Sequence, residues 1–297
     1  MLTLTKDTVV RSMSAAHPPA ARAHSGDVVK FITMDAMGDQ YVGQNDYEID
    51  ESLGGNPATG PLFVEGAQPG DTLKVSILDI TVTGMATMTL APGFGVFAEE
   101  IPALERRVYT YENNCLRFNE HLLLPLSPMI GVIGTAPAAG EVLNDSPGPH
   151  GGNMDNKRIV AGSTVYLPIF HEGALLSIGD VHALMGDGEV CICGAEVQAH
   201  VTVRVEVVKQ SFETVMIVSG DRAMTVCAAK TLEEASFNAT KAMRRFLERA
   251  LGMSFFDSGC ILSLLGDMRI CEVVDPLMTC RMEVPLSLFD AYGYAFP

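Results

Sequence analysis

The chain has 297 residues, of which 47% are hydrophobic, and its formal net charge at pH 7 is −16. This length is sufficient to bury a large core, while the excess of acidic side chains argues against nucleic acid and anionic membranes as partners. A membrane span is not expected either, because no window contains roughly 18 uninterrupted apolar residues.

The cysteines and the N-terminus indicate a compartment. Seven cysteines are scattered along the chain, and the Cys191–Cys193 pair has no second pair at zinc-finger spacing. We interpret them as free thiols in a reducing environment, in preference to a metal or disulfide pair. Residues 1–11 alternate charge and lack the apolar core of a secretion signal. A cytoplasmic protein is therefore expected.

Alternation of apolar and polar residues dominates the chain up to about residue 220. In 73–77 and again in 201–207, Leu, Val or Ile alternates with polar residues, a period typical of half-buried strands. Residues 214–219 follow a short polar link and are predicted to be the hairpin partner of 201–207. Further strands are expected at 28–34, 108–111 and 165–170. The close punctuation by Gly and Pro is typical of sandwiches and barrels.

The hydrophobic period changes after residue 230. Thr231 and Glu234 form a capping box, in which the Thr side chain can cap the Glu amide, and this predicts the start of a helix. Gly252 is expected to end that helix. A second helix is predicted at 254–265, followed by strands at 268–274 and 278–284.

These patterns define the expected fold class. We predict a mainly β protein with sandwich- or barrel-like sheets and a smaller C-terminal α+β unit. The β-rich catalytic region is expected at 1–225. The α+β unit is expected at 226–297, packed intimately with the first region.

Two glycine-dense turns, 148–155 and 179–189, carry side chains that can bind a cation. Glycine permits positive φ and close backbone approach, and loops on a rigid scaffold often hold binding groups. His182 is the best single ligand candidate, because Asp180 would project from the same face of an extended backbone. The candidates in the two turns are His150, Asp155, Asp180, His182, Asp187 and Glu189.

Each turn also has a plainer interpretation. The second turn is equally compatible with a surface hairpin whose Asp and Gly serve turn geometry. His150 is equally compatible with a hydrogen-bonded structural histidine. No Gly-x-Ser-x-Gly elbow and no recognisable cysteine nucleophile are present, and a bound cation offers an alternative way to activate water.

Glu65 and Asp35 are two further carboxylates next to apolar residues. Glu65 lies between apolar neighbours just before the turn at 69–71, and Asp35 lies at the end of an apolar strand. Each is either a partnered buried charge or a working acid or base. Because apolar flanks would desolvate its carboxylate, Glu65 is assigned as the general acid/base. Both residues are also counted among the candidate metal ligands.

Several segments lie in order along nearly the whole chain and carry a family resemblance. They are 33–40 (TMDAMGDQ), 56–61 (NPATGP), 64–71 (VEGAQPGD), 131–134 (GVIG), 148–155 (GPHGGNMD) and 172–189. Through them the chain resembles the acetamidase/formamidase family. The resemblance implies hydrolysis of small linear amides to a carboxylate and ammonia. The aromatic-rich N-terminal segment of longer members is shortened here to residues 16–19.

Residues and resemblance together define the expected site. Glu65, His182 and Asp155 are expected to act in catalysis, and a histidine ligand favours zinc over calcium as the divalent metal. A second, structural calcium is compatible with the ligand number. The expected metal ligands are Asp35, Glu65, His150, Asp155, Asp180, His182, Asp187 and Glu189.

Two alternatives remain open at this point. One is an enzyme that opens a small cyclic amide, or lactam, with the same metal chemistry. The other is a non-catalytic β-sandwich module that binds calcium. The expected partners are a small amide substrate and further copies of the chain, in a homodimer or higher homo-oligomer.

Overall fold

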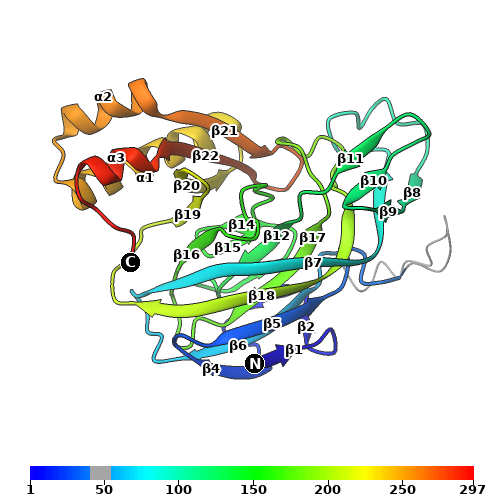
Figure 1. Ribbon diagram of the computed structural model, residues 1–297, viewed down its shortest axis with the longest axis horizontal. Coiled ribbons are helices and arrows are strands. Elements are labelled where there is room, and N and C mark those ends of the chain that lie inside the picture. Colours follow the sequence, from blue (N-terminus) through cyan, green and yellow to red (C-terminus); the bar gives the residue numbers. More distant parts are fainter. Residues whose placement is uncertain (41–54) are drawn as a thin grey trace.

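The computed structural model describes residues 1–40 and 55–297, which are mainly strands (Figure 1). Among these residues, one large, curled sheet is mostly antiparallel. Its strands are β1 (Leu2–Leu4), β2 (Val9–Val10), β4 (Ala21–His24), β5 (Val28–Thr33), β6 (Ala58–Glu65), β7 (Thr72–Leu90), β8 (Glu105–Tyr109), β12 (Met129–Gly134), β14 (Pro147–Gly148), β15 (Gly151–Asn153), β16 (Thr164–Pro168), β17 (Leu176–His182), β18 (Glu196–Val208), β19 (Val215–Ser219), β20 (Arg222–Ala229), β21 (Asp267–Glu272) and β22 (Met278–Pro285).

Two small sheets complete the strand content of the described residues. They are formed by β9 (Tyr111–Glu112), β10 (Cys115–Arg117) and β11 (Leu123–Pro125), and by β3 (Ser12–Ser14) with β13 (Glu141–Leu143). The predicted mainly β fold is therefore confirmed.

Strand β18 lies between β5 and β7 in the centre of the large sheet. Val201, Val203 and Val205 are fully buried, which confirms the predicted alternation. The predicted hairpin partner is wrong in its pairing, because β5 and β7 already occupy both edges of β18. Strand β19 exists, but it pairs with β16 and β20.

The helices lie on one side of the molecule, beside β20 to β22 (Figure 1). They are α1 (Leu232–Leu251), α2 (Phe255–Leu265) and α3 (Leu286–Ala291). The backbone N–H of Glu234 donates to Oγ1 of Thr231 at 3.2 Å, and Gly252 has φ 65°, so the predicted start and end of α1 are confirmed. None of these helices is long and apolar enough to cross a membrane.

The helices and the sheet share a second apolar core. Tyr166 and Phe212 pack there with Phe246 from α1 and Phe289 from α3. The boundary predicted after residue 225 falls inside β20, which pairs with β19 on one edge and β22 on the other. The division of the chain into two units stays a prediction.

Candidate metal centre and active site

Strand β17 positions the candidate site. All seven of its residues are buried, because the strand pairs with β6, β12 and β18. His182, at its end, faces Glu196 at the start of β18 in the antiparallel register. Asp180, within the same strand, has a left-handed φ of 52°, so the backbone from Asp180 to His182 is not the regularly extended one that the sequence predicted.

Carboxylates surround one imidazole nitrogen. Nε2 of His182 lies 3.1 Å from Oε1 of Glu196 and 3.4 Å from Oδ1 of Asp180. It lies 3.8 Å from Oδ1 of Asp155 and 3.9 Å from Oε1 of Glu189. All five side chains are buried. Asp155, Asp180 and His182 form one group of ligand atoms within 4.8 Å of one another, and His182, Glu189 and Glu196 form a second.

Two glycines leave room for this cluster. A Cβ on Gly131 would lie 2.5 Å from Oδ1 of Asp155 and 2.7 Å from Oδ2 of Asp180. A Cβ on Gly194 would lie 2.4 Å from Nδ1 of His182. Real Cβ atoms do not approach other atoms so closely, so any larger residue at these positions would displace the ligand side chains.

Three of the clustered acids have unusual backbone conformations. Asp155, Asp180 and Glu189 have φ values of 39°, 52° and 43°, in the left-handed region that non-glycine residues seldom adopt. Such strain persists only where the surrounding structure imposes it, and it concentrates at functional sites. All three residues with these conformations belong to the buried cluster around His182.

Burial controls the protonation of the cluster. It raises the pKa of Asp155 to about 7 and that of Glu196 to about 8, and with the charge of Asp155 it raises the pKa of Glu189 as well. Burial alone would lower the pKa of His182, but the charges of Glu196 and Asp180 hold it well above its usual value. So many close acids need either protons or a cation for compensation.

Several atoms of the cluster lack well-oriented hydrogen bonds within the described residues, although they are buried. They are Oδ1 of Asp155, Oδ1 of Asp180, both ring nitrogens of His182 and Oε2 of Glu196. Buried polar atoms are nearly always satisfied in proteins. A divalent cation would satisfy them, because imidazole nitrogen and carboxylate oxygen are its common ligands. The residues present therefore fit a metal ion.

A cavity of about 570 Å³ leads to the cluster. Its polar lining includes Asp180, Glu189, Glu196, Asn153 and Asp275, and its apolar lining includes Phe94 and Ile192. A volume of this order is typical of small-molecule sites, which combine an apolar wall with a few polar groups. The cavity therefore gives a small ligand access to the carboxylates.

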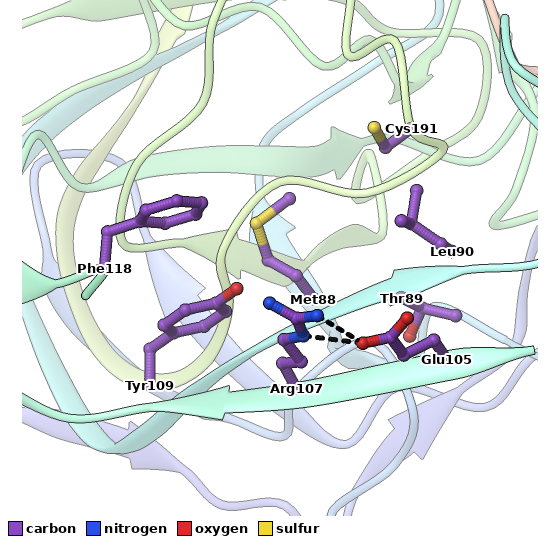
Figure 2. Close-up of a pocket in the computed structure, with 8 residues that line it drawn as sticks. All are labelled: Met88, Thr89, Leu90, Glu105, Arg107, Tyr109, Phe118 and Cys191. Carbon is purple, nitrogen blue, oxygen red and sulfur yellow. Dashed lines mark hydrogen bonds and ion pairs between the residues drawn. The ribbon is translucent and has the colours of Figure 1, made fainter.

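Figure 2 shows a smaller neighbouring cavity of about 260 Å³. Tyr109 and Phe118 stack on one side of it with 5.6 Å between ring centroids, and Cys191 lies on the other. Its one carboxylate, Glu105, accepts a hydrogen bond from Nε of Arg107 at 2.7 Å. This carboxylate is exposed and paired, whereas both groups of close ligand atoms include His182, so the larger cavity is the candidate active site.

Four of the predicted ligands come together as expected, namely Asp155, Asp180, His182 and Glu189. Glu65 does not join them. Its side chain is 40% exposed and accepts a hydrogen bond from Nη1 of Arg22 at 2.9 Å, so the expected desolvation is wrong. Val64 is fully buried, and because side chains alternate along β6 the next one, Glu65, points outward.

Asp35 is buried but organises a turn. Its Oδ1 accepts hydrogen bonds from the backbone N–H groups of Met37 at 3.0 Å and Asp39 at 2.9 Å. Burial raises its pKa, and those two hydrogen bonds act in the opposite direction. The structure therefore shows Asp35 as a carboxylate committed to its own backbone, outside the cluster around His182.

His150 and Asp187 also lie outside that cluster. His150 is buried between Gly148 and Gly152, and burial lowers its pKa to about 4. Asp187 makes two hydrogen bonds with the guanidinium of Arg281, at 2.7 and 2.8 Å. Its carboxylate is thereby committed to an ion pair.

Two residues that sequence reasoning missed contribute to the site. Glu196 could have been found from the sequence. If 180–182 pairs with an N-terminal extension of the predicted strand 201–207, Glu196 lies opposite His182. Asp275 has no local signal, because it reaches the cavity from a turn after β21. Its Oδ2 accepts a hydrogen bond from Nδ2 of Asn153 at 2.8 Å. Burial, with Asp155 and Glu272 nearby, raises its pKa to about 10.

The chain is similar to known proteins over most of its length. The model of the Acetamidase/Formamidase family matches residues 13–148 and 144–291. The crystal structure of an acetamidase from Bacillus halodurans is 41% identical, with a TM-score of 0.95, over 98% of this chain and 100% of that one. A predicted acetamidase/formamidase from Thermoanaerobacter tengcongensis is 38% identical, with a TM-score of 0.97, over 99% of both chains.

The chain spans only about half to two thirds of the length of the curated relatives that it matches. The acetamidase of Mycolicibacterium smegmatis is 29% identical over 224 residues, which cover 52% of this chain and 54% of that protein. In the three curated relatives compared, the matched segment covers 54% to 63% of the relative's own length. The family match nevertheless extends over most of the sequence. The chain belongs to the acetamidase/formamidase family.

Proposed function

We propose that this protein hydrolyses small linear amides of the formamide and acetamide type to a carboxylate and ammonia, with zinc as a divalent cofactor. The observation that carries the proposal is the buried ring of carboxylate oxygens around Nε2 of His182, reached through a cavity of about 570 Å³. The names of the acetamidases from Mycolicibacterium smegmatis and Bacillus halodurans support amide chemistry.

The residues that would hold the cation are those of the cluster. They are Asp155, Asp180, His182, Glu189 and Glu196. Imidazole at the centre favours zinc or a similar metal, because calcium selects oxygen ligands. When bound, such a cation polarises the amide carbonyl and makes water a stronger nucleophile at neutral pH.

Hydrolysis also requires a group that takes a proton from water and gives one to the departing ammonia. We assign this role to Asp275 in place of Glu65. Asp275 lines the cavity, and its hydrogen bond from Asn153 leaves the second carboxylate oxygen available for a proton. Oε2 of Glu272 accepts hydrogen bonds from the N–H groups of Val274 at 2.9 Å and Asp275 at 3.0 Å, which holds the turn in place.

The alternatives gain less support. A calcium-binding module does not account for a histidine at the centre of the acids. For a second, structural calcium, both groups of close ligand atoms found among the described residues include His182, so neither is a separate site. Ring opening of a small lactam would use the same residues, and substrate tests separate it from linear amide hydrolysis.

The proposal is tested by ammonia release from formamide and acetamide and by ring opening of 2-pyrrolidinone. The protein is assayed as purified, after removal of metal by a chelator, and after addition of Zn²⁺ or Ca²⁺. We expect hydrolysis of the linear amides, its loss after chelation, and its return with Zn²⁺ but not with Ca²⁺.

Two results would overturn the proposal. Full activity in protein that elemental analysis shows to be free of metal would exclude the cofactor role. Zinc-loaded protein that opens the lactam but releases no ammonia from linear amides would establish the alternative substrate class.

A further inference from the structure

Ile192 has a backbone conformation that its residue type disfavours. It lies in the loop between β17 and β18 and has φ 71°. A positive φ is a genuine outlier for a β-branched residue, because its branched side chain crowds the backbone. Gly188, in the same loop, also has a positive φ, so the chain uses glycine for this geometry only a few residues away.

The loop cannot relieve this strain by moving, because contacts fix it on both sides of Ile192. The N–H of Val96 donates to the carbonyl of Val190 at 2.8 Å, and the N–H of Thr89 donates to Sγ of Cys193 at 3.2 Å. Within the loop, the N–H of Ile192 donates to the carbonyl of Glu189 at 2.9 Å. Glu189 belongs to the acidic cluster, so the same turn places a candidate ligand and the strained isoleucine.

Neighbouring side chains of this loop serve different cavities. Cys191 borders the smaller cavity, as Figure 2 shows, whereas Ile192 lines the cavity that leads to the acidic cluster. Phe94 lines the same large cavity from a second loop. The two loops touch closely, since a Cβ on Gly95 would lie 2.8 Å from the carbonyl oxygen of Val190. Ile192 and Phe94 therefore form an apolar wall next to polar groups.

We propose that Ile192 determines substrate specificity by limiting the length of the acyl chain of the amide. This inference rests on the proposed function. The polar amide end of a substrate would face the acids and Asn153, so its acyl substituent would extend towards the apolar wall. Glycine would adopt this backbone conformation without strain, whereas the isoleucine side chain fills space in the cavity.

Replacement of Ile192 by glycine tests the inference. The Ile192→Gly variant removes the side chain and permits the same backbone, so the ratio of kcat/KM for butyramide to that for acetamide is expected to rise roughly tenfold or more. Ile192→Val keeps the branched shape and is expected to keep a ratio close to that of the wild type. Cys191→Ala is the matched control, because Cys191 precedes Ile192 directly but does not line the large cavity.

A binding measurement separates this inference from the proposed function. The relative affinity of the zinc-loaded protein for butyrate and acetate is measured by calorimetry, and Ile192→Gly is expected to shift it towards butyrate. Phe94→Ala is expected to shift the kinetic ratio towards butyramide and the binding ratio towards butyrate. This second variant tests the apolar wall if Ile192→Gly does not fold. Unchanged binding and kinetic ratios in a folded Ile192→Gly protein would overturn the inference. If no amide is hydrolysed, the proposed function fails and the binding ratio alone decides on Ile192.

Discussion

Nε2 of His182 lies 3.1 Å from Oε1 of Glu196, and the two residues face each other across neighbouring antiparallel strands. The pair is almost completely buried. Its position in the sheet, instead of in a mobile loop, holds the imidazole at the point where the other carboxylates converge. A site on rigid elements keeps its geometry without the cation and binds it with less loss of entropy.

Replacement of His182 by alanine should remove the metal. We expect zinc affinity to fall by roughly 10–100-fold or more, because the variant loses the only nitrogen ligand of the cluster. The strand content, measured by circular dichroism, should remain. His200 is a partly exposed histidine of β18, and His200→Ala serves as the control, which should keep the zinc content of the wild type. Wild-type metal content in His182→Ala would show that the centre lies elsewhere.

Replacement of Asp275 by asparagine should separate binding from turnover. Asparagine preserves the shape of the side chain but cannot take up and release a proton as a carboxylate does. Zinc content should therefore stay near wild type while kcat falls by roughly 10²–10⁴-fold. Glu65→Gln is the comparison, because Glu65 lies in an exposed ion pair with Arg22. That variant should keep its rate, and its stability should change by at most about 1 kcal/mol. Loss of turnover in Glu65→Gln alone would restore the role predicted from the sequence.

Gly131 should not tolerate alanine. The added methyl group would meet the carboxylates of Asp155 and Asp180, both of which it would displace. We expect Gly131→Ala to lose most of its zinc and activity. Gly186→Ala is the matched control in the neighbouring loop, because among the described residues no atom beyond its adjacent residues lies within 4 Å of the point that its Cβ would occupy. Equal zinc content in both variants, measured by elemental analysis, would contradict the packing argument.

Asp187 should stabilise the fold without binding metal. Burial alone would raise its pKa, but hydrogen bonds from Arg281 outweigh this and hold the pKa below its usual value. A carboxylate with a lowered pKa stabilises the folded state above the pKa of the unfolded chain, about 4. That contribution is lost as the pH falls through the lower pKa of the folded state.

We therefore expect Asp187→Asn to keep its zinc and to lower the free energy of unfolding by about 1–3 kcal/mol at pH 7. Chemical denaturation at a series of pH values measures this difference. The gap between wild type and variant should close as the pH is lowered below about 4. A gap that widens on acidification would contradict the assigned pKa shift.

Local periodicity was enough to predict much of the architecture. The buried valines of β18 and the capping of α1 by Thr231 depend on neighbours within a few residues, so the sequence contains the necessary information. Four of the cluster's side chains were also predictable, because they crowd two glycine-dense turns. Asp155, Asp180, His182 and Glu189 are those four.

Tertiary structure alone decided which carboxylates have partners. Asp187 and Glu189 are two residues apart, yet Asp187 pairs with Arg281, 94 positions along the chain, while Glu189 joins the cluster. Glu65 follows apolar residues but points outward beside Arg22, and Asp275 reaches the cavity from a distant turn. Alternation is a property of a single strand, whereas the charge that a carboxylate meets depends on which distant segment the fold places opposite it.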